Sequence, residues 1–168
     1  LGTTPDRLLT AWQVHSPDAV TVDRPWTGER PKADALVTAT PGLAIGALTA
    51  DCTPILFADP HARVIGAAHA GWRGALAGVI DRTVEAMERL GARRERIAAA
   101  IGPVIGPDSY EIGPEFEREF TSAGAGHAAF FHTTVSGRRH FDLPRFCRSR
   151  LDTLGIGRVE DLGLDTYA

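Results

Sequence analysis

Two short apolar runs on either side of a turn do most to constrain the fold of this chain. They cover 54–58 (PILFA) and 63–68 (RVIGAA), with Asp and Pro between them. Apolar runs of this length, bounded by turn residues, are typical of buried strands. A reactive side chain stands beside each run, since Cys52 precedes the first and His69 follows the second. A site at these strand ends would rest on a rigid frame.

The segment after His69 predicts the most regular element of the chain, an amphipathic helix over 75–90. Its apolar positions recur at helical spacing and comprise Leu76, Val79, Ile80, Thr83, Val84, Met87 and Leu90. Charged residues take the opposite face, and Gly91 supplies a C-terminal stop. The turn GWRG at 71–74 joins this helix to His69, so we expect the helix N-terminus near that histidine.

The rest of the chain alternates strand and helix patterns. We expect short strands at 12–15, 20–22, 35–39, 43–48 and 97–101, and helices at 114–120 and 144–154. The strands are short and unevenly spaced. This pattern favours a single α/β or α+β domain over a regular doubly wound sheet.

Composition narrows the class of protein. A chain of 168 residues, 43% hydrophobic and 23% charged, has the make-up of an ordinary globular domain with one core. A net charge of −3 gives no electrostatic basis for binding nucleic acid or an anionic membrane. No apolar run is long enough to cross a bilayer. Two cysteines do not make a disulfide framework, so we expect free thiols and a cytoplasmic location.

Cys52 follows Asp51 in a turn and admits three interpretations. It can be a buried free thiol, which is the usual fate of an intracellular cysteine. It can be a metal ligand, because thiolate and imidazole together suit zinc. It can be a nucleophile that His69 activates as a base. The second cysteine, Cys147, lies on the apolar face of its predicted helix and is assigned to the core.

Arg73, His15 and His140 are the other candidate site residues. Arg73 stands beside the predicted helix N-terminus and could hold a phosphate with two hydrogen bonds, although a surface salt bridge is the simpler interpretation. His15 closes the segment WQVHS, and His140 precedes a predicted helix. No spacing rule links positions 15, 52 and 69, so the residues alone do not define a metal site.

Five motifs, taken in chain order, resemble those of a known family. They are QVHS at 13–16, DALVT at 34–38, ADCTPI at 50–55, HAGWRG at 69–74 and IGPVIGPDSYEIG at 101–113. The family is the laccase-domain group, long known as multicopper polyphenol oxidases and now regarded as zinc-dependent purine nucleoside phosphorylases. The pair HAGWRG and ADCTPI is a specific signal, and the matching segment covers most of the chain.

The resemblance implies that His15, Cys52 and His69 bind one zinc ion, with Cys52 and His69 in the catalytic centre. Three protein ligands and an open position are the pattern of a catalytic zinc. The implied substrates are adenosine, inosine, guanosine and methylthioadenosine. The implied reactions are phosphorolysis of the N-glycosidic bond and deamination of adenosine. Arg73 and His140 are then the candidates for binding phosphate or substrate.

The resemblance also implies a layered α/β/β/α sandwich with mixed sheets, in a single domain that spans 1–168. The chain departs from the family pattern at Ser16, Ser109 and Tyr167. We expect it to lack the family's N- and C-terminal segments. Purine nucleosides and phosphate are the expected partners, and the sequence does not indicate an oligomeric state.

Three alternatives stay open. A Cys–His hydrolase or deamidase would use Cys52 as nucleophile and His69 as base, but zinc bound by Cys52 would leave no free nucleophile. A copper polyphenol oxidase needs several His-rich ligand sets, whereas this chain has six scattered histidines. A non-catalytic, metal-stabilised binding module would unfold when Cys52 is replaced by alanine.

Overall fold

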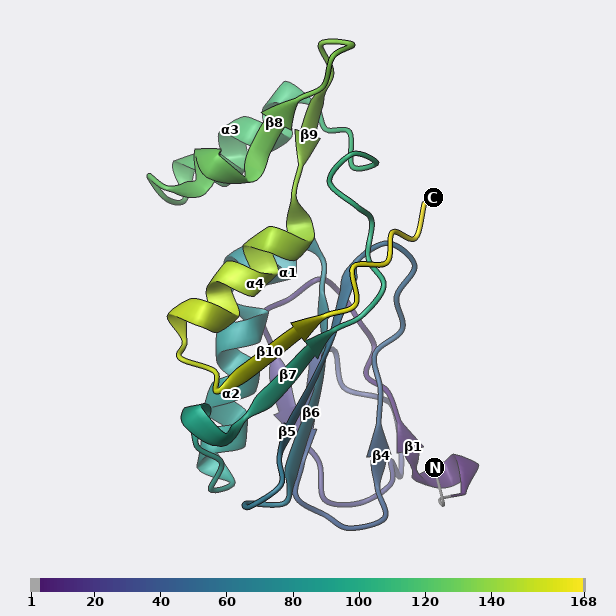
Figure 1. Cartoon of the computed structure of the whole chain (residues 1–168). Coiled ribbons are helices and arrows are strands. Elements are labelled where there is room, and N and C mark those ends of the chain that lie inside the picture. Colours follow the sequence, from purple (N-terminus) through teal and green to yellow (C-terminus); the bar gives the residue numbers. More distant parts are fainter. Residues whose placement is uncertain (1–3, 168) are drawn as a thin grey trace.

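A six-stranded mixed sheet lies at the centre of the computed structural model, which describes residues 4–167 (Figure 1). The strand order is β10-β7-β5-β6-β3-β2. The bounds are Ala19–Thr21 for β2, Ala35–Thr38 for β3, Thr53–Asp59 for β5, Val64–Ala70 for β6, Ala98–Ile101 for β7 and Arg158–Asp161 for β10. The pairs β2–β3 and β7–β10 are parallel and the other pairs are antiparallel.

The two apolar runs form the central hairpin of this sheet, which confirms their prediction as strands. β5 and β6 pair along their whole length, with Thr53 opposite Ala70 at one end. Because the pairing is antiparallel, the start of β5 lies beside the end of β6. This geometry places Cys52 and His69 at the same end of the hairpin.

Helices cover one face of the sheet. They are α1 (Trp72–Ala77), α2 (Val79–Arg89) and α4 (Leu143–Thr153), all on the same side of β5 and β6 in Figure 1. Alternate strand residues point toward them, so Ile55 and Phe57 are fully buried in the main core. The predicted helices at 114–120 and 144–154 are confirmed to within two residues as α3 (Pro114–Ser122) and α4.

The prediction of one continuous helix over 75–90 is wrong. The helix begins at Trp72, and it is interrupted at Gly78, which has a φ of +101° and both ends α1 and begins α2. A glycine adopts this left-handed conformation at little cost, so the interruption needs no compensating contact. The apolar periodicity continues across the break, and for this reason the pattern alone did not reveal it.

A small second β layer covers part of the opposite face. It consists of β1 (Leu8–Leu9) and β4 (Ala44–Ile45), which pair in parallel. Between this layer and the sheet lies a separate core made of Leu9, Ala11, Val22, Ala33, Leu36 and Leu43. Helices, a mixed sheet and a second β layer confirm the predicted layered α+β domain.

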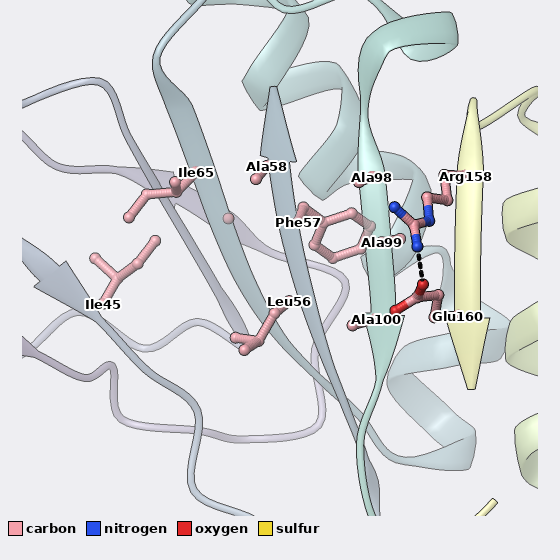
Figure 2. Close-up of a pocket in the computed structure, with 11 residues that line it drawn as sticks. Ile45, Leu56, Phe57, Ala58, Ile65, Ala98, Ala99, Ala100, Arg158 and Glu160 are labelled. Atoms are coloured by element: carbon pink, nitrogen blue, oxygen red, sulfur yellow. Dashed lines mark hydrogen bonds and ion pairs between the residues drawn. The ribbon is translucent and has the colours of Figure 1, made fainter. Parts of the chain in front are cut away.

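The remainder of this face is open and forms a groove of about 410 Å³ over β5, β6 and β7. Figure 2 shows Leu56, Ile65 and Ile45 pointing into it, with Ala98 and Ala100 along its floor. Leu56 is 57% exposed and Ile65 is 38% exposed. An ion pair between side chains of β10 borders the groove (Figure 2).

A helix and a hairpin extend from one end of the sheet (Figure 1). They are α3 (Pro114–Ser122), β8 (Phe131–Thr133) and β9 (Arg139–Phe141), packed around the buried ring of Phe120. Short 3₁₀ helices occupy Pro5–Arg7, Arg94–Arg96 and His127–Phe130. Within residues 4–167, no helix is both long and apolar enough to cross a membrane.

Two strand predictions need correction. The segment 12–15 is not a strand, because it makes only an isolated bridge at Trp12 and His15 has a φ of +61°. The run 43–48 contributes only the two residues of β4. Conversely, β1, β8, β9 and β10 were not predicted, since segments of two to four residues carry too little periodicity.

Candidate metal centre

Three side chains from separate segments converge at one end of the central hairpin. The ligand atoms of His15, Cys52 and His69 all lie within 4.8 Å of one another. Cys52 Sγ is 3.8 Å from His15 Nε2, and the two imidazole rings meet edge to face with centroids 4.8 Å apart. Within the described part of the chain, no other group of three His, Cys, Asp or Glu side chains is placed to share an ion.

The hairpin register explains why Cys52 meets His69. His69 lies opposite Pro54, and Cys52 immediately precedes β5. His69 is only 4% exposed, whereas Cys52 is half-buried and His15 is exposed. The cluster is therefore anchored in the sheet through His69 and open to solvent through His15.

His15 reaches the cluster from an irregular loop that a buried carboxylate holds in place. Asp34 accepts hydrogen bonds from the backbone N–H groups of Val14 (3.1 Å), His15 (3.0 Å) and Ser16 (2.7 Å). It also accepts one from the Ser16 hydroxyl at 3.0 Å. The same carboxylate lies 2.8 Å from His69 Nδ1. One side chain thus contacts both histidine-bearing segments.

Asp34 was not predicted as a site residue. Burial by itself raises the pKa of this carboxyl, but the hydrogen bonds from His69, Ser16 and Val14 outweigh burial and lower the pKa overall. The residue is 1% exposed, so these hydrogen bonds, and not contact with solvent, stabilise its charged form. One signal in the sequence could have identified it, namely an aspartate placed directly before the apolar strand ALVT. An aspartate at such a place is expected to be buried, and a buried carboxylate needs several hydrogen-bond donors.

The environment of Cys52 suits a metal ligand better than a free nucleophile. Burial raises the pKa of its thiol above the ordinary value of 9.0, and the nearby carboxylates of Asp51 and Asp34 raise it further. Nucleophilic cysteines need the opposite surroundings, which favour the thiolate. The imidazole within hydrogen-bonding range of Sγ belongs to His15, whereas His69 directs its Nδ1 to Asp34.

The donor set fits a tetrahedral ion such as zinc. Zinc bound by sulfur and imidazole nitrogen places neighbouring ligand atoms roughly 3.5 Å apart. The 3.8 Å between Cys52 Sγ and His15 Nε2 is close to that spacing. A divalent cation would also neutralise a thiolate that the local carboxylates otherwise disfavour.

Hydrogen bonds between distant segments brace the two ligand-bearing loops. The Gln13 side chain donates to the carbonyl of Leu48 at 2.7 Å and accepts from its N–H at 2.8 Å. The Thr166 hydroxyl donates to Asp51 at 2.8 Å. These contacts tie the residues near His15 to those before Cys52, and they tie Cys52's own loop to the C-terminal segment.

Two further residues, Arg73 and Tyr110, belong to the electrostatic surroundings of Cys52. Arg73 is exposed, and its guanidinium stacks on the Trp72 ring at 4.4 Å. Burial raises the pKa of Tyr110 to about 12; the charge of Cys52 acts in the same direction and that of Arg73 opposes it. The Tyr110 phenol is thus within electrostatic range of both Cys52 and Arg73. Sequence reasoning missed Tyr110 because nothing distinguishes it from a core aromatic residue.

His140, the other predicted substrate-binding residue, lies in β9 and outside the three-residue cluster. Its ring is 4% exposed and stacks on that of His132 with centroids 5.6 Å apart. Nδ1 lies 3.3 Å from the carbonyl oxygen of Arg138. Its part in substrate binding stays a prediction.

Replacing Gly71 by alanine is expected to weaken metal binding at least tenfold. A Cβ at this position would lie 2.7 Å from His15 Cδ2 and 2.9 Å from Cys52 Sγ, so both ligands must move. The backbone at Gly71 has a φ of −67°, which alanine adopts freely, so the effect is purely steric. Competition of the protein with a chromophoric zinc chelator measures the change.

Gly126→Ala is the matched control. Gly126 has a φ of −88°, and a Cβ there meets nothing within 4 Å. Its zinc affinity should equal that of the unchanged protein. Equal affinities for the Gly71 and Gly126 variants would show that the ligands are not held against Gly71.

Proteins named purine nucleoside phosphorylase are similar to this chain. One from Deinococcus radiodurans is 45% identical over 159 residues, which cover 94% of this chain and 60% of that protein. One from Streptomyces griseus is 48% identical over 158 residues, covering 93% of this chain and 63% of that protein. The chain thus spans less than two thirds of the length of these relatives.

Solved structures share the fold. The Neisseria meningitidis protein NMB0706 of the DUF152 family superposes with a TM-score of 0.82 at 34% identity, over 95% of this chain and 64% of that one. The Bacillus licheniformis hypothetical protein YfiH superposes with a TM-score of 0.85 at 27% identity, over 98% of this chain and 66% of that one.

The family model described as multi-copper polyphenol oxidoreductase laccase matches residues 1–168. The match covers every segment that contributes to the cluster. The similarity to the relatives and to the solved structures likewise extends over nearly the whole chain. The chain belongs to this laccase-like family, whose curated members similar to it are named purine nucleoside phosphorylase.

Proposed function

We propose that this chain forms a zinc-dependent purine nucleoside phosphorylase that acts on adenosine, inosine, guanosine and methylthioadenosine and also deaminates adenosine. The observation that carries the proposal is the convergence of His15, Cys52 and His69 within 4.8 Å. It occurs in a chain 45% and 48% identical to proteins with the phosphorylase name. Purine nucleosides and phosphate are accordingly the proposed partners.

Zinc is the proposed metal, in spite of the copper in the family's description. A multicopper oxidase uses several ligand sets, and residues 4–167 bring together one such set. That set, one thiolate and two imidazoles, leaves a fourth position open for substrate or water. Cys52 and Cys147 are both free thiols, as a reducing cytoplasm would keep them. Metal analysis of the purified protein distinguishes zinc from copper.

The residues around the cluster have separable proposed roles. A zinc ion there would supply Lewis acidity toward a substrate oxygen or a water molecule. His15, Cys52 and His69 would hold it, and the exposed side of His15 leaves the approach free. Tyr110, with a pKa of about 12, keeps its O–H at physiological pH and can donate a hydrogen bond to substrate.

Arg73→Ala is expected to raise the KM for phosphate by about 10- to 100-fold, because a guanidinium binds phosphate through two charge-assisted hydrogen bonds. Adenosine deamination needs no phosphate and should change little. Arg89→Ala, which removes an exposed arginine from the last turn of α2, is the matched control. Phosphate-dependent turnover that is undiminished in the Arg73 variant would exclude this role.

The proposal is tested by incubating the zinc-loaded protein with adenosine, with and without phosphate. Chromatography then separates the possible products. Adenine with ribose 1-phosphate, formed only when phosphate is present, indicates phosphorolysis, and inosine indicates deamination. No product under either condition, with stoichiometric zinc bound, would contradict the proposal.

A further inference from the structure

We infer that Asp34 is a positioning residue that fixes both imidazoles of the metal centre, one through its ring and the other through its backbone. The inference deepens the proposed function and rests on the metal centre described there. Its basis is the set of contacts that one carboxylate makes with two segments far apart in the sequence.

The contact with His69 selects one tautomer of the ring. Asp34 Oδ1 lies 2.8 Å from His69 Nδ1, and the two side chains are 0% and 5% exposed. A carboxylate oxygen accepts hydrogen bonds, so this geometry assigns Nδ1 as the donor of the pair. Because Asp34 engages Nδ1, the nitrogen left to face a metal ion is Nε2. A carboxylate behind a histidine ligand commonly orients the ring and raises its basicity.

The contact with the segment 14–16 fixes the backbone of the second ligand. His15 has a φ of +61°, a left-handed conformation that is unfavourable for a residue other than glycine. Three consecutive N–H groups, those of Val14, His15 and Ser16, point at the carboxylate of Asp34. These hydrogen bonds hold the strained residue in place, and its ring presents Nε2 to Cys52.

Asp34 itself is held by the sheet. It directly precedes β3, where Ala35 pairs with Ala68 of β6. The backbone carbonyl of Asp34 accepts from the His69 N–H at 2.7 Å, so main chain and side chain of one residue contact one histidine. Both carboxylate oxygens of Asp34 accept hydrogen bonds. An asparagine would present an NH₂ group to some of these donors, and no rotation of the amide satisfies them all.

Zinc affinity separates positioning from simple stabilisation. Asp34→Asn is expected to bind zinc about 10- to 100-fold more weakly, the usual effect of losing such a partner. Asp59→Asn is the matched control: Asp59 is equally buried and hydrogen-bonded but lies at the opposite end of β5 from Cys52. It should lower the melting temperature and leave zinc affinity unchanged. Competition with a chelator, well below both melting temperatures, gives the two affinities.

Equal zinc affinity in Asp34→Asn and the unchanged protein would overturn the inference, as would an equal loss in the Asp59 control. A second measurement needs no variant. Long-range ¹H–¹⁵N NMR of the metal-free protein reports which ring nitrogen of His69 carries the proton, and protonated Nδ1 is expected. A proton on Nε2 alone would refute the positioning role. Absence of zinc binding to the unchanged protein would instead contradict the proposed function, and the NMR result would still decide the role of Asp34.

Discussion

Replacing Cys52 by alanine is expected to abolish stoichiometric zinc binding and to lower phosphorolysis of adenosine about 1,000-fold, roughly 4 kcal/mol of transition-state stabilisation. Cys52 is the only ligand in the cluster that carries a negative charge when metal-bound. Without it, two neutral imidazoles remain, one on the exposed loop of His15. The measurements are metal content after dialysis and initial rates of adenine release.

The fold should survive this change. Cys52 is half-buried and precedes β5, so its removal leaves the pairing of β5 with β6 intact. Cys147→Ala, at the fully buried second cysteine, is the matched control. It should cost about 1 kcal/mol of stability and leave zinc binding unchanged. A Cys52 variant that unfolds would favour the alternative of a metal-stabilised binding module.

The proximity of Cys52 and His69, the two site residues that lie close together in the sequence, could be predicted from the sequence. Two apolar runs with a turn between them define a hairpin, and an antiparallel hairpin brings the residue before its first strand close to the last residues of its second. Cys52 and His69 occupy those places. The amphipathic periodicity likewise located the helical layer, although it did not show the break at Gly78.

The position of His15, which is distant from Cys52 and His69 in the sequence, could not be predicted from periodicity or spacing. His15 joins the cluster through a left-handed backbone and a buried carboxylate that lies 19 residues away in the sequence. No propensity encodes such a contact, because its energy comes from donors and acceptors that meet only after folding. The grouping of His15 with Cys52 and His69 came from the resemblance to the laccase-domain family. The structure now gives that grouping a geometry, while metal binding itself stays a prediction.

The most acid-sensitive single contribution to stability is expected to come from Asp59, at the far end of β5. Its carboxylate is 0% exposed. It accepts hydrogen bonds from the backbone N–H groups of His61, Ala62 and Arg93 and from the Arg96 guanidinium, all at 2.9–3.1 Å. It thereby ties the β5–β6 turn to the segment before β7. Asp59→Ala should lower the free energy of unfolding by about 3 kcal/mol, since it leaves buried donors and a cation without their acceptor.

The pH dependence follows from the pKa of Asp59. Burial alone would raise it, but the hydrogen bonds from Ala62, Arg93 and Arg96 lower it from 3.8 to about 2. The folded state therefore binds this proton less readily than the unfolded state. The resulting stabilisation, roughly 2–3 kcal/mol, is complete above pH 3.8 and is lost as the pH falls through about 2. Urea unfolding between pH 5 and pH 2 should show a shallower decline for Asp59→Ala than for the unchanged protein.

Asp23→Ala is the matched control for this experiment. Asp23 also pairs with an arginine, Arg24, but its side chain is 69% exposed and solvent screens the pair. The free energy of unfolding of this variant should follow that of the unchanged protein at every pH. Parallel pH curves for all three proteins would show that the hydrogen bonds to Asp59 do not carry the acid sensitivity. A steeper decline in the two proteins that retain Asp59 than in Asp59→Ala would show that this buried carboxylate, far from the metal centre, carries the acid sensitivity of the fold.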